Sequence, residues 1–412
     1  MKKTFKYKIY TNKETINKTE NWLELCRRLY NSCLEERIQA YKESGKGITC
    51  NNQMLRLKSL KQEHPEYKEV GSQVLQGVLQ RLDLAYKHFF RKVKNGDKSG
   101  FPRFKGYNRY HSFTFKQTGW KLESKYLTIR NIGIFKIKLS RPIEGTIKTV
   151  TIKRSPANKW YVFFSCDDVP NRQFPDTNKE VGIDVGIKNF AVDSEGGCIA
   201  NPKYFSQSQK LLRMRQRKLA RRKKGSNRRN KARILVAKAH EKVSNQRNDF
   251  LHKLANNYIK AFKIIYIEDL TIRNMVHNRH LSKSIMDASW GIFFRYLSYK
   301  AVEADRIVVK VKPQGTSQIC SICGEIVPKT LSVRIHNCPY CGSVMDRDFN
   351  SSINIKKLGQ SFWDSIPAMA GMSRESSDFS HGECQQFNNI GSSSIKKEEL
   401  PNQRQRWIQK KL

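Results

Sequence analysis

The chain has 412 residues, and its 78 lysines and arginines outnumber its 36 acidic residues, which gives a formal net charge of +42. Such an excess repels itself in a compact protein, so we expect a polyanionic partner, meaning a nucleic acid. No run of about 18 apolar residues is present, so no membrane-spanning helix and no membrane partner are predicted. The basic N-terminus precedes no apolar stretch, so we expect no signal peptide and a cytoplasmic location.

The N-terminal part begins with a short predicted strand and continues as helices. Apolar residues recur every three or four positions from about Glu14, and again from about Ser72 to Val93, which predicts two amphipathic helices. Glycine and proline in segment 100–106 then end the helical pattern. Residues 11–107 therefore read as a small helical domain. The polar face of the second helix carries three glutamines, Gln73, Gln76 and Gln80.

Residues 108–180 change to short runs of β-branched and aromatic residues, separated by turn residues at regular spacing. This pattern is typical of a small all-β unit. Residues 1–10 supply one further strand, which we expect to close the unit. The sequence therefore predicts a small β-barrel built from residues 1–10 and 108–180.

The remaining part alternates strands with long helices, which indicates an α/β sheet. The predicted strands cover 180–193 (with a turn at Gly186), 263–267 and 306–311, and the predicted helices cover 207–247 (with a break at 224–227), 249–260, 289–304 and residues from Asn350 onward. After residue 360 the composition becomes polar and finally basic. We predict a flexible tail over residues 361–412.

The predicted helix at 207–247 carries an unusual charge run. Thirteen lysines and arginines lie between Lys210 and Arg233 with no acidic residue among them. A charge run is often only a solvated face, but the acidic partners common on surface helices are missing here. We expect the segment to follow a phosphate backbone. The candidate contacts are Arg213, Arg217, Arg221, Arg222, Lys223, Arg228 and Arg229.

Four of the ten cysteines stand in metal-binding spacing, and the other six are scattered, as expected of reduced thiols in a cytoplasm. Each of the two pairs, Cys320 with Cys323 and Cys338 with Cys341, is separated by two residues and followed by glycine. Two such pairs can place four thiolates around one zinc ion. A site with four thiolates has no open coordination position, so its predicted role is structural.

Three acidic residues lie on strand-like or helix-start segments: Asp184, Glu268 and Asp348. Phosphodiester hydrolysis by two metal ions needs carboxylates on rigid elements to hold Mg²⁺ or Mn²⁺. Asp184, on a central strand, is suited to bridge two such ions. The neighbouring Asp269 and Asp346 are equally acidic, and spacing alone does not exclude them.

The combination of motifs resembles the TnpB family, the OrfB-type proteins of bacterial insertion sequences, and is similar to the miniature type V CRISPR effectors. The resemblance covers nearly the whole chain to about residue 360 and is most specific in the second half. The matching segments are 182–188 around Asp184, 268–270, 316–324 and 346–350, with weaker matches at 100–105 (Gly-Phe-Pro-Arg-Phe-Lys) and 245–252.

The resemblance implies a multidomain α+β protein, bacterial and associated with the nucleoid when bound to DNA. Its metal-dependent DNA endonuclease domain would have an RNase H-like (RuvC) α/β fold. The resemblance selects Asp184, Glu268 and Asp348 as ligands of two Mg²⁺ or Mn²⁺ ions, and Cys320, Cys323, Cys338 and Cys341 as ligands of structural Zn²⁺. The implied partners are a guide RNA transcribed from the element's end and double-stranded target DNA next to a short flanking motif.

The implied domains are a β-barrel wedge domain at 1–10 and 108–180, a helical recognition domain at 11–107, a nuclease domain at 181–317 and 344–360, and a zinc ribbon at 318–343. Gln73, Gln76 and Gln80 could then reach base edges, because glutamine pairs well with adenine; an ordinary polar helix face is the alternative. Arg103 and Lys105, in the weaker match, are further candidate contacts to nucleic acid.

Other functions remain compatible with the sequence. A miniature CRISPR effector would use the same chemistry. An unguided RNase H-like nuclease would not need the helical domain and the barrel. A guided protein that binds without cleaving would not need the three carboxylates. A structural RNA-binding protein of the ribosomal kind would account for the charge alone.

Overall fold

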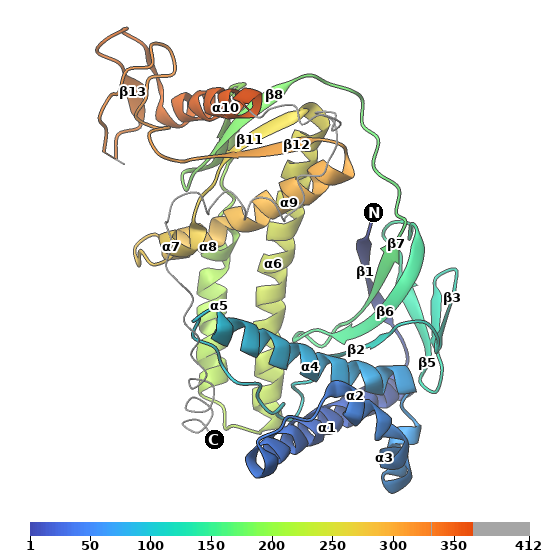
Figure 1. Ribbon diagram of the computed structural model, residues 1–412. Coiled ribbons are helices and arrows are strands. Elements are labelled where there is room, and N and C mark those ends of the chain that lie inside the picture. Colours follow the sequence, from blue (N-terminus) through green and yellow to red (C-terminus); the bar gives the residue numbers. More distant parts are fainter. Residues whose placement is uncertain (331, 366–412) are drawn as a thin grey trace.

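The computed structural model describes residues 1–330 and 332–365, and it contains two large sheets, joined by an extended segment at 168–179, and several long helices (Figure 1). The N-terminal sheet has seven antiparallel strands in the order β2-β6-β7-β1-β5-β4-β3. Its strands are β1 (Lys3–Tyr10), β2 (Ser112–Phe115), β3 (Trp120–Glu123), β4 (Tyr126–Ile129), β5 (Gly133–Lys138), β6 (Thr146–Arg154) and β7 (Trp160–Asp167).

The predicted strand at the N-terminus is confirmed, but it does not close a barrel. Strand β1 pairs with β7 on one side and β5 on the other, so it lies inside the sheet. Strands β2 and β3 form its two edges and do not pair with each other, so the described residues form an open half-barrel. The prediction of a barrel closed by residues 1–10 was therefore wrong.

Helices cover one face of this sheet. The predicted helices are α1 (Lys13–Ser44), whose N-cap residue Asn12 accepts a hydrogen bond from Thr15 N, and α4 (Ser72–Lys94). Trp22 of α1 packs against Phe113 and Phe115, with ring centroids 5.7 and 6.3 Å apart. The predicted helical and barrel domains therefore share one hydrophobic core. Between the two helices lie the short elements α2 (Cys50–Leu55), α3 (Leu57–Glu63) and η1 (Pro65–Lys68), which the sequence analysis did not predict.

After the first strands of the second sheet, the chain forms a hairpin of two helices. Helix α5 (Tyr204–Ala220) and helix α6 (Asn227–Ala261) lie side by side, and the predicted break near residue 224 is the turn between them (Figure 1). Helix α6 runs without interruption through residue 248, so the separate helix expected at 249–260 is the last part of α6. None of the described helices is both long enough and apolar enough to cross a lipid bilayer.

The second sheet has the order β10-β9-β8-β11-β12, which confirms the predicted α/β organisation. Strand β8 is antiparallel to β9 and parallel to β11, and β11 is parallel to β12. The strands are β8 (Glu180–Val185), β9 (Asn189–Asp193), β10 (Cys198–Ala200), β11 (Ile264–Glu268) and β12 (Ile307–Val311). The smaller elements nearby are α7 (Ile272–Met275), α8 (Ser282–Ala288), β13 (Ile335–Asn337) and β14 (Val344–Asp346).

The two faces of this sheet are covered by different helices. Ile183 and Ile267 belong to a core shared with α6 and α9 (Trp290–Glu303), whereas Tyr266 packs with Ile355 of α10 (Arg347–Ser365). Helix α10 includes residues 361–365, so the prediction of a flexible tail was wrong for these five residues. The rest of that tail, 366–412, lies outside the described residues.

Two glycines let α10 lie directly on the sheet. A Cβ atom added at Gly182 of β8 would lie 2.2 Å from the carbonyl oxygen of Ser352, and one at Gly359 would lie 2.0 Å from the ring of Tyr266. Neither position tolerates a side chain without movement of the helix. The close approach fixes the N-terminal turn of α10 above the ends of β8 and β11.

We predict that Gly182→Ala pushes α10 away from β8 and lowers the free energy of unfolding by about 1–3 kcal/mol, as overpacking of a core does. Denaturant unfolding of the variant measures this loss. Gly47→Ala is the matched control, because a Cβ there would have nothing within 4 Å. Equal stability of the two variants would contradict the proposed close packing.

Candidate metal centres

Asp184 and Glu268 lie at the same level on adjacent parallel strands. Ile183 of β8 is paired with Ile267 of β11, and the two acidic residues follow directly. Neighbouring strands are about 4.8 Å apart, and residues in register project from the same face of a sheet. Ile183 and Val185 are buried on the α6 side, so Asp184 faces α10.

Asp348 reaches the same place from α10, which runs antiparallel along β8. Gln360 donates to Glu180 at 2.7 Å, the backbone of Lys356 contacts Gly182, and Ser351 hydrogen-bonds Asp184. One turn nearer the start of α10, a carboxylate oxygen of Asp348 lies 3.8 Å from where a Cβ of Gly186 would be. The structure thus brings Asp184, Glu268 and Asp348 together, and we call them the acidic triad.

The acidic neighbours of the triad, Asp346 and Asp269, make other contacts in the structure. Oδ1 of Asp346 accepts hydrogen bonds from the backbone N–H groups of Asp348 and Phe349, at 2.8 and 3.3 Å, so Asp346 acts as the N-terminal cap of α10. Asp269 is exposed and pairs with Lys310 at 3.1 Å. Both alternatives left open by the sequence are therefore occupied elsewhere.

The triad is electrostatically strained when no cation is bound. Burial raises the pKa of Asp184 well above its ordinary value, the charges of Glu268 and Asp348 raise it further, and Arg347 and Ser351 lower it. Burial likewise raises the pKa of Glu268, against a hydrogen bond from Thr316 that lowers it. A group of buried carboxylates with raised pKa values attracts a cation.

Arg347 supplies the nearest positive charge to the triad. Its Nη2 lies 3.0 Å from Oδ1 of Asp348, and its Nη1 donates to the carbonyl of Val333 at 3.1 Å. Carboxylate oxygens are the ligands that Mg²⁺ and Mn²⁺ prefer, so the donor set of the triad fits these ions. Within the described part of the chain, only the four cysteines bring three or more ligand atoms all within 4.8 Å of one another. The carboxylate oxygens of the triad are therefore spread over longer distances than the cysteine sulfur atoms.

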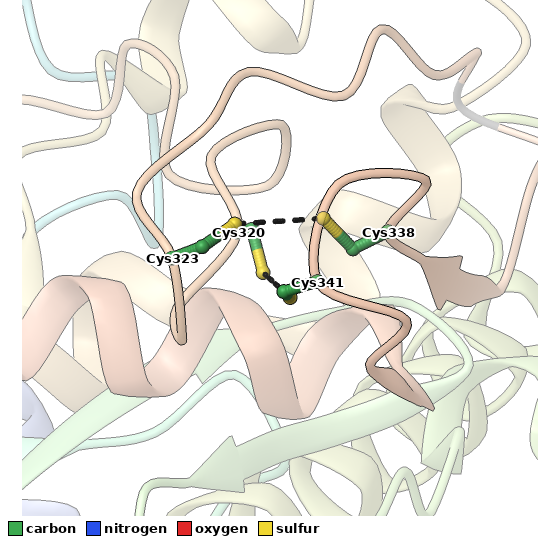
Figure 2. A group of neighbouring side chains, drawn as sticks. All are labelled: Cys320, Cys323, Cys338 and Cys341. Carbon is green, nitrogen blue, oxygen red and sulfur yellow. Dashed lines mark hydrogen bonds between the residues drawn. The ribbon is translucent and has the colours of Figure 1, made fainter.

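The four predicted cysteines converge on one point (Figure 2). Sγ of Cys320 lies 3.7 Å from Sγ of Cys341, and Sγ of Cys323 lies 3.6 Å from Sγ of Cys338. Four thiolates around zinc, with Zn–S bonds of about 2.3 Å, stand about 3.8 Å apart. The sulfur atoms therefore fit a tetrahedral zinc ion with little movement.

Each cysteine pair belongs to a tight turn, and we call residues 320–324 the first knuckle and 338–342 the second. In both turns the glycine N–H donates to the carbonyl of the first cysteine at 3.0 Å. Gly324 and Gly342 have positive φ angles of 84° and 74°, a conformation that favours glycine. The glycine after each pair is thus explained by the turn.

Sequence reasoning did not single out the polar residues that surround these sites. Thr316 donates to Oε1 of Glu268 at 2.7 Å, and Asn350 and Asn354 of α10 donate to the carbonyl of Ile319 before the first knuckle, at 2.8 and 2.7 Å. Thr316 and Asn350 lie inside the two motifs that were recognised. Their roles depend on contacts across the fold, which motif spacing does not show.

The three glutamines of α4 differ in how free their side chains are to contact a nucleic acid. Oε1 of Gln73 accepts from the backbone N–H groups of residues 116–118 at 3.1–3.4 Å, and its Nε2 donates to Thr118 at 3.1 Å. Gln73 therefore holds α4 to the loop after β2, and its expected role in reading a base stays a prediction. Gln76 is exposed and Gln80 is half-buried, so both stay predictions.

Arg103 and Lys105 lie in a loop that is fastened to α1. The backbone of Lys105 donates to Asn31 at 2.7 Å and accepts from Arg27 at 2.9 Å. Nζ of Lys105 lies 5.2 Å from the ring centroid of Tyr30, whereas Arg103 is exposed. Arg103 remains the more accessible of the two candidates.

The basic hairpin contains both exposed and structural cations. Arg229 donates to the carbonyls of Leu219 and Arg222, at 3.0 and 2.8 Å, and so caps the end of α5. Both contacts are made by Nη1 of Arg229, and its expected contact with a phosphate stays a prediction. Arg222 is half-buried. The remaining candidates are exposed: Arg213, Arg217, Arg221, Lys223 and Arg228.

We predict that the purified chain contains about one zinc ion, held by the four cysteines, and that Cys320→Ser lowers this content to near zero. Atomic spectrometry measures the zinc. Loss of zinc should also disturb the residues near Asp348, because α10 holds the first knuckle. Cys198→Ser is the control, since Cys198 is exposed on β10. Full zinc content in Cys320→Ser would contradict the assignment.

We also predict that Asp184→Asn stabilises the chain in buffer without Mg²⁺ or Mn²⁺. The raised pKa of Asp184 means that folding of the wild type costs more as pH rises from about 3.9 to the raised value. Asparagine removes this cost, by about 1.4 kcal/mol for each unit of the shift.

The gain should therefore be absent near about pH 4, grow with rising pH and then level off. Denaturant unfolding at a series of pH values measures it. Asp269→Asn should show no such trend, because Asp269 is exposed. A gain that does not depend on pH would show that the charge of Asp184 is not its cause.

Comparison with known proteins places these features in a family. The family model of the OrfB protein of IS605, described as "Probable transposase", matches residues 163–279, and a Cas12f1-like TNB domain matches 290–355. A helix-turn-helix model of the same OrfB protein matches residues 1–46, where the structure has strand β1 and the single long helix α1.

Individual relatives agree with these matches. A Streptomyces pristinaespiralis protein named as an RNA-guided DNA endonuclease is 33% identical over 87% of this chain and 90% of its own length. The InsQ protein of Escherichia coli K12, named likewise, is 30% identical over 81% of this chain and 86% of its own. The TnpB-like protein L770 of Acanthamoeba polyphaga mimivirus is 25% identical over 55% of this chain and 46% of its own. The chain therefore belongs to the TnpB family, the OrfB-type proteins of insertion sequences.

Proposed function

We propose that this chain is an RNA-guided DNA endonuclease of transposon origin. The observation that carries the proposal is the convergence of Asp184, Glu268 and Asp348 beside one another at the ends of β8, β11 and the start of α10. Its two nearly full-length relatives are named as RNA-guided DNA endonucleases. The net charge of +42 suits a protein that holds both a guide RNA and a DNA target.

The nuclease domain is proposed to have an RNase H-like (RuvC) fold. In support, β8 lies in the middle of a mixed sheet, with the antiparallel β9 and then β10 on one side and the parallel β11 and β12 on the other. Helices cover both faces, and the carboxylates gather where β8 and β11 end. Ligands of α/β proteins bind at the carboxyl ends of the strands, and the triad lies at the carboxyl ends of β8 and β11.

The triad would hold two Mg²⁺ or Mn²⁺ ions, which, when bound, supply an activated water and stabilise the leaving oxygen of a phosphodiester. Asp184, on the central strand, would be one of the ligands that hold these ions. Thr316 and Ser351 orient two of the carboxylates through hydrogen bonds. Arg347 would remain near Asp348 and offset part of the negative charge.

The other parts of the chain are proposed to hold nucleic acid. The exposed cations of α5 and of the turn after it have no ion pair with an acidic residue of 1–330 or 332–365, and they suit a phosphate backbone. The half-barrel would act as the wedge domain and α1 to α4 as the recognition domain, with Gln76, Gln80 and Arg103 as candidate contacts to the flanking motif or the guide. Zinc in the knuckles would be structural.

A miniature type V CRISPR effector is the second candidate, favoured by the match of residues 290–355 to a Cas12f1-like TNB domain. The chemistry would be the same, and the source of the guide would differ. Sequencing the RNA that co-purifies from cells carrying the native locus separates the two. An RNA that ends in sequence beside the element supports the transposon origin, a repeat-derived RNA supports the CRISPR effector, and no specific RNA contradicts both.

We predict that Asp184→Ala lowers Mg²⁺-dependent cleavage of guided target DNA by at least about 100-fold, because the central metal ligand is lost. Binding of the co-purifying RNA should stay unchanged, since the triad lies apart from the basic hairpin surface. A plasmid cleavage assay and an RNA-binding titration measure the two effects. Asp269→Ala is the control, and cleavage retained by Asp184→Ala would overturn the role of this residue.

A further inference from the structure

Thr316 is a buried residue that joins the acidic triad to the first knuckle. Only 3% of its surface is exposed. Its hydroxyl lies 2.7 Å from Oε1 of Glu268, closer than its 3.2 Å approach to the carbonyl of Pro313. The ionised carboxylate can only accept, so the threonine donates its single proton to Glu268.

The backbone of the same segment is held by α10. Asn354 donates to the carbonyl of Thr316 at 2.8 Å and to that of Ile319 at 2.7 Å. Asn350 accepts from the N–H of Ser321 at 2.9 Å, and Lys357 donates to the carbonyl of Ser321 at 2.6 Å. These three side chains lie three or four residues apart along α10, so one face of the helix holds residues 316–321 in place.

The zinc knuckles are therefore not a separate unit, because they are connected to the acidic triad and to α10. Residues 316–321 run from the hydroxyl that contacts Glu268 to the first cysteine ligand, and both ends are buried. Helix α10, which carries Asp348 itself, fixes this segment along its length. A shift of the first knuckle would be transmitted to Glu268 through only four peptide bonds.

We infer that Thr316 is a positioning residue, which fixes the carboxylate of Glu268 for binding of the divalent cation and couples that carboxylate to the zinc knuckles. The inference rests on the proposed function, because it assigns Glu268 as a metal ligand. Hydrogen bonds to a metal-ligating carboxylate orient it and raise the affinity of the site for its metal. A threonine whose only role was packing would not need its hydroxyl.

The test compares Thr316→Val, which keeps the shape and removes the hydroxyl, with Thr316→Ser, which keeps the hydroxyl. Mn²⁺ binding is titrated by calorimetry on the full-length chain freed of nucleic acid, because RNA phosphates also bind Mn²⁺. Zinc content and thermal unfolding are measured on the same samples. Asp184→Ala defines the binding that belongs to the triad.

We expect Thr316→Val to weaken Asp184-dependent Mn²⁺ binding by about 10-fold or more, with zinc content unchanged, and Thr316→Ser to stay within about threefold of the wild type. Mn²⁺ affinity of Thr316→Val equal to that of the wild type would overturn the inference and leave the proposed function standing. Loss of zinc from Thr316→Val would overturn it in favour of a structural role. Absence of Asp184-dependent binding in the wild type would overturn the proposed metal site and this inference together.

Discussion

The direct contact of α10 with strands β8 and β11 is the constraint on which the candidate site depends. Gly182 has no side chain where the backbone of α10 crosses β8, and Gly359 has none where the helix crosses Tyr266. With these two contacts fixed, the antiparallel run of α10 along β8 places its first turn at the end of the strand. Asp348, some 160 residues from Asp184 in the sequence, reaches Asp184 only because of this packing.

The same packing creates an electrostatic cost. Three carboxylates gather where burial and mutual repulsion raise the pKa of Asp184, and Arg347 and a hydrogen bond with Ser351 oppose this rise. Such unfavourable charge interactions are common at functional sites. They lower the stability of the ligand-free protein, and a bound ligand restores that stability. In the proposed metal site a bound divalent cation would reverse the balance, because each carboxylate that destabilises the cation-free fold would then contribute to affinity. The proposed site would therefore link metal binding to the stability of the sheet that carries it.

The sequence predicted the features with local signals. The strand that carries Asp184, the order of strands and helices, and the cysteine spacing each depend on residues close in the chain. The sequence did not predict the contacts that side chains make across the fold, such as those of Gln73 with the loop at 116–118 and of Arg229 with the end of α5. Strand β1 was recognised as a strand, but its place between β7 and β5 follows from pairing with residues more than 100 positions away. Resemblance to a family selected Asp348 over Asp346, and the capping contact of Asp346 now gives a physical reason.

The distribution of acidic residues explains how the basic hairpin is held without losing its charge. Glu241 is the single acidic residue between Tyr204 and Asn248. Its carboxylate pairs with Lys159 at 2.6 Å and accepts from Tyr161 at 2.9 Å, both on β7 or just before it. Glu241 thus joins α6 to the half-barrel, and it neutralises Lys159 beside the sheet, not the cations of α5. Those cations remain uncompensated within the described chain, and the phosphates of a nucleic acid would supply the missing charge.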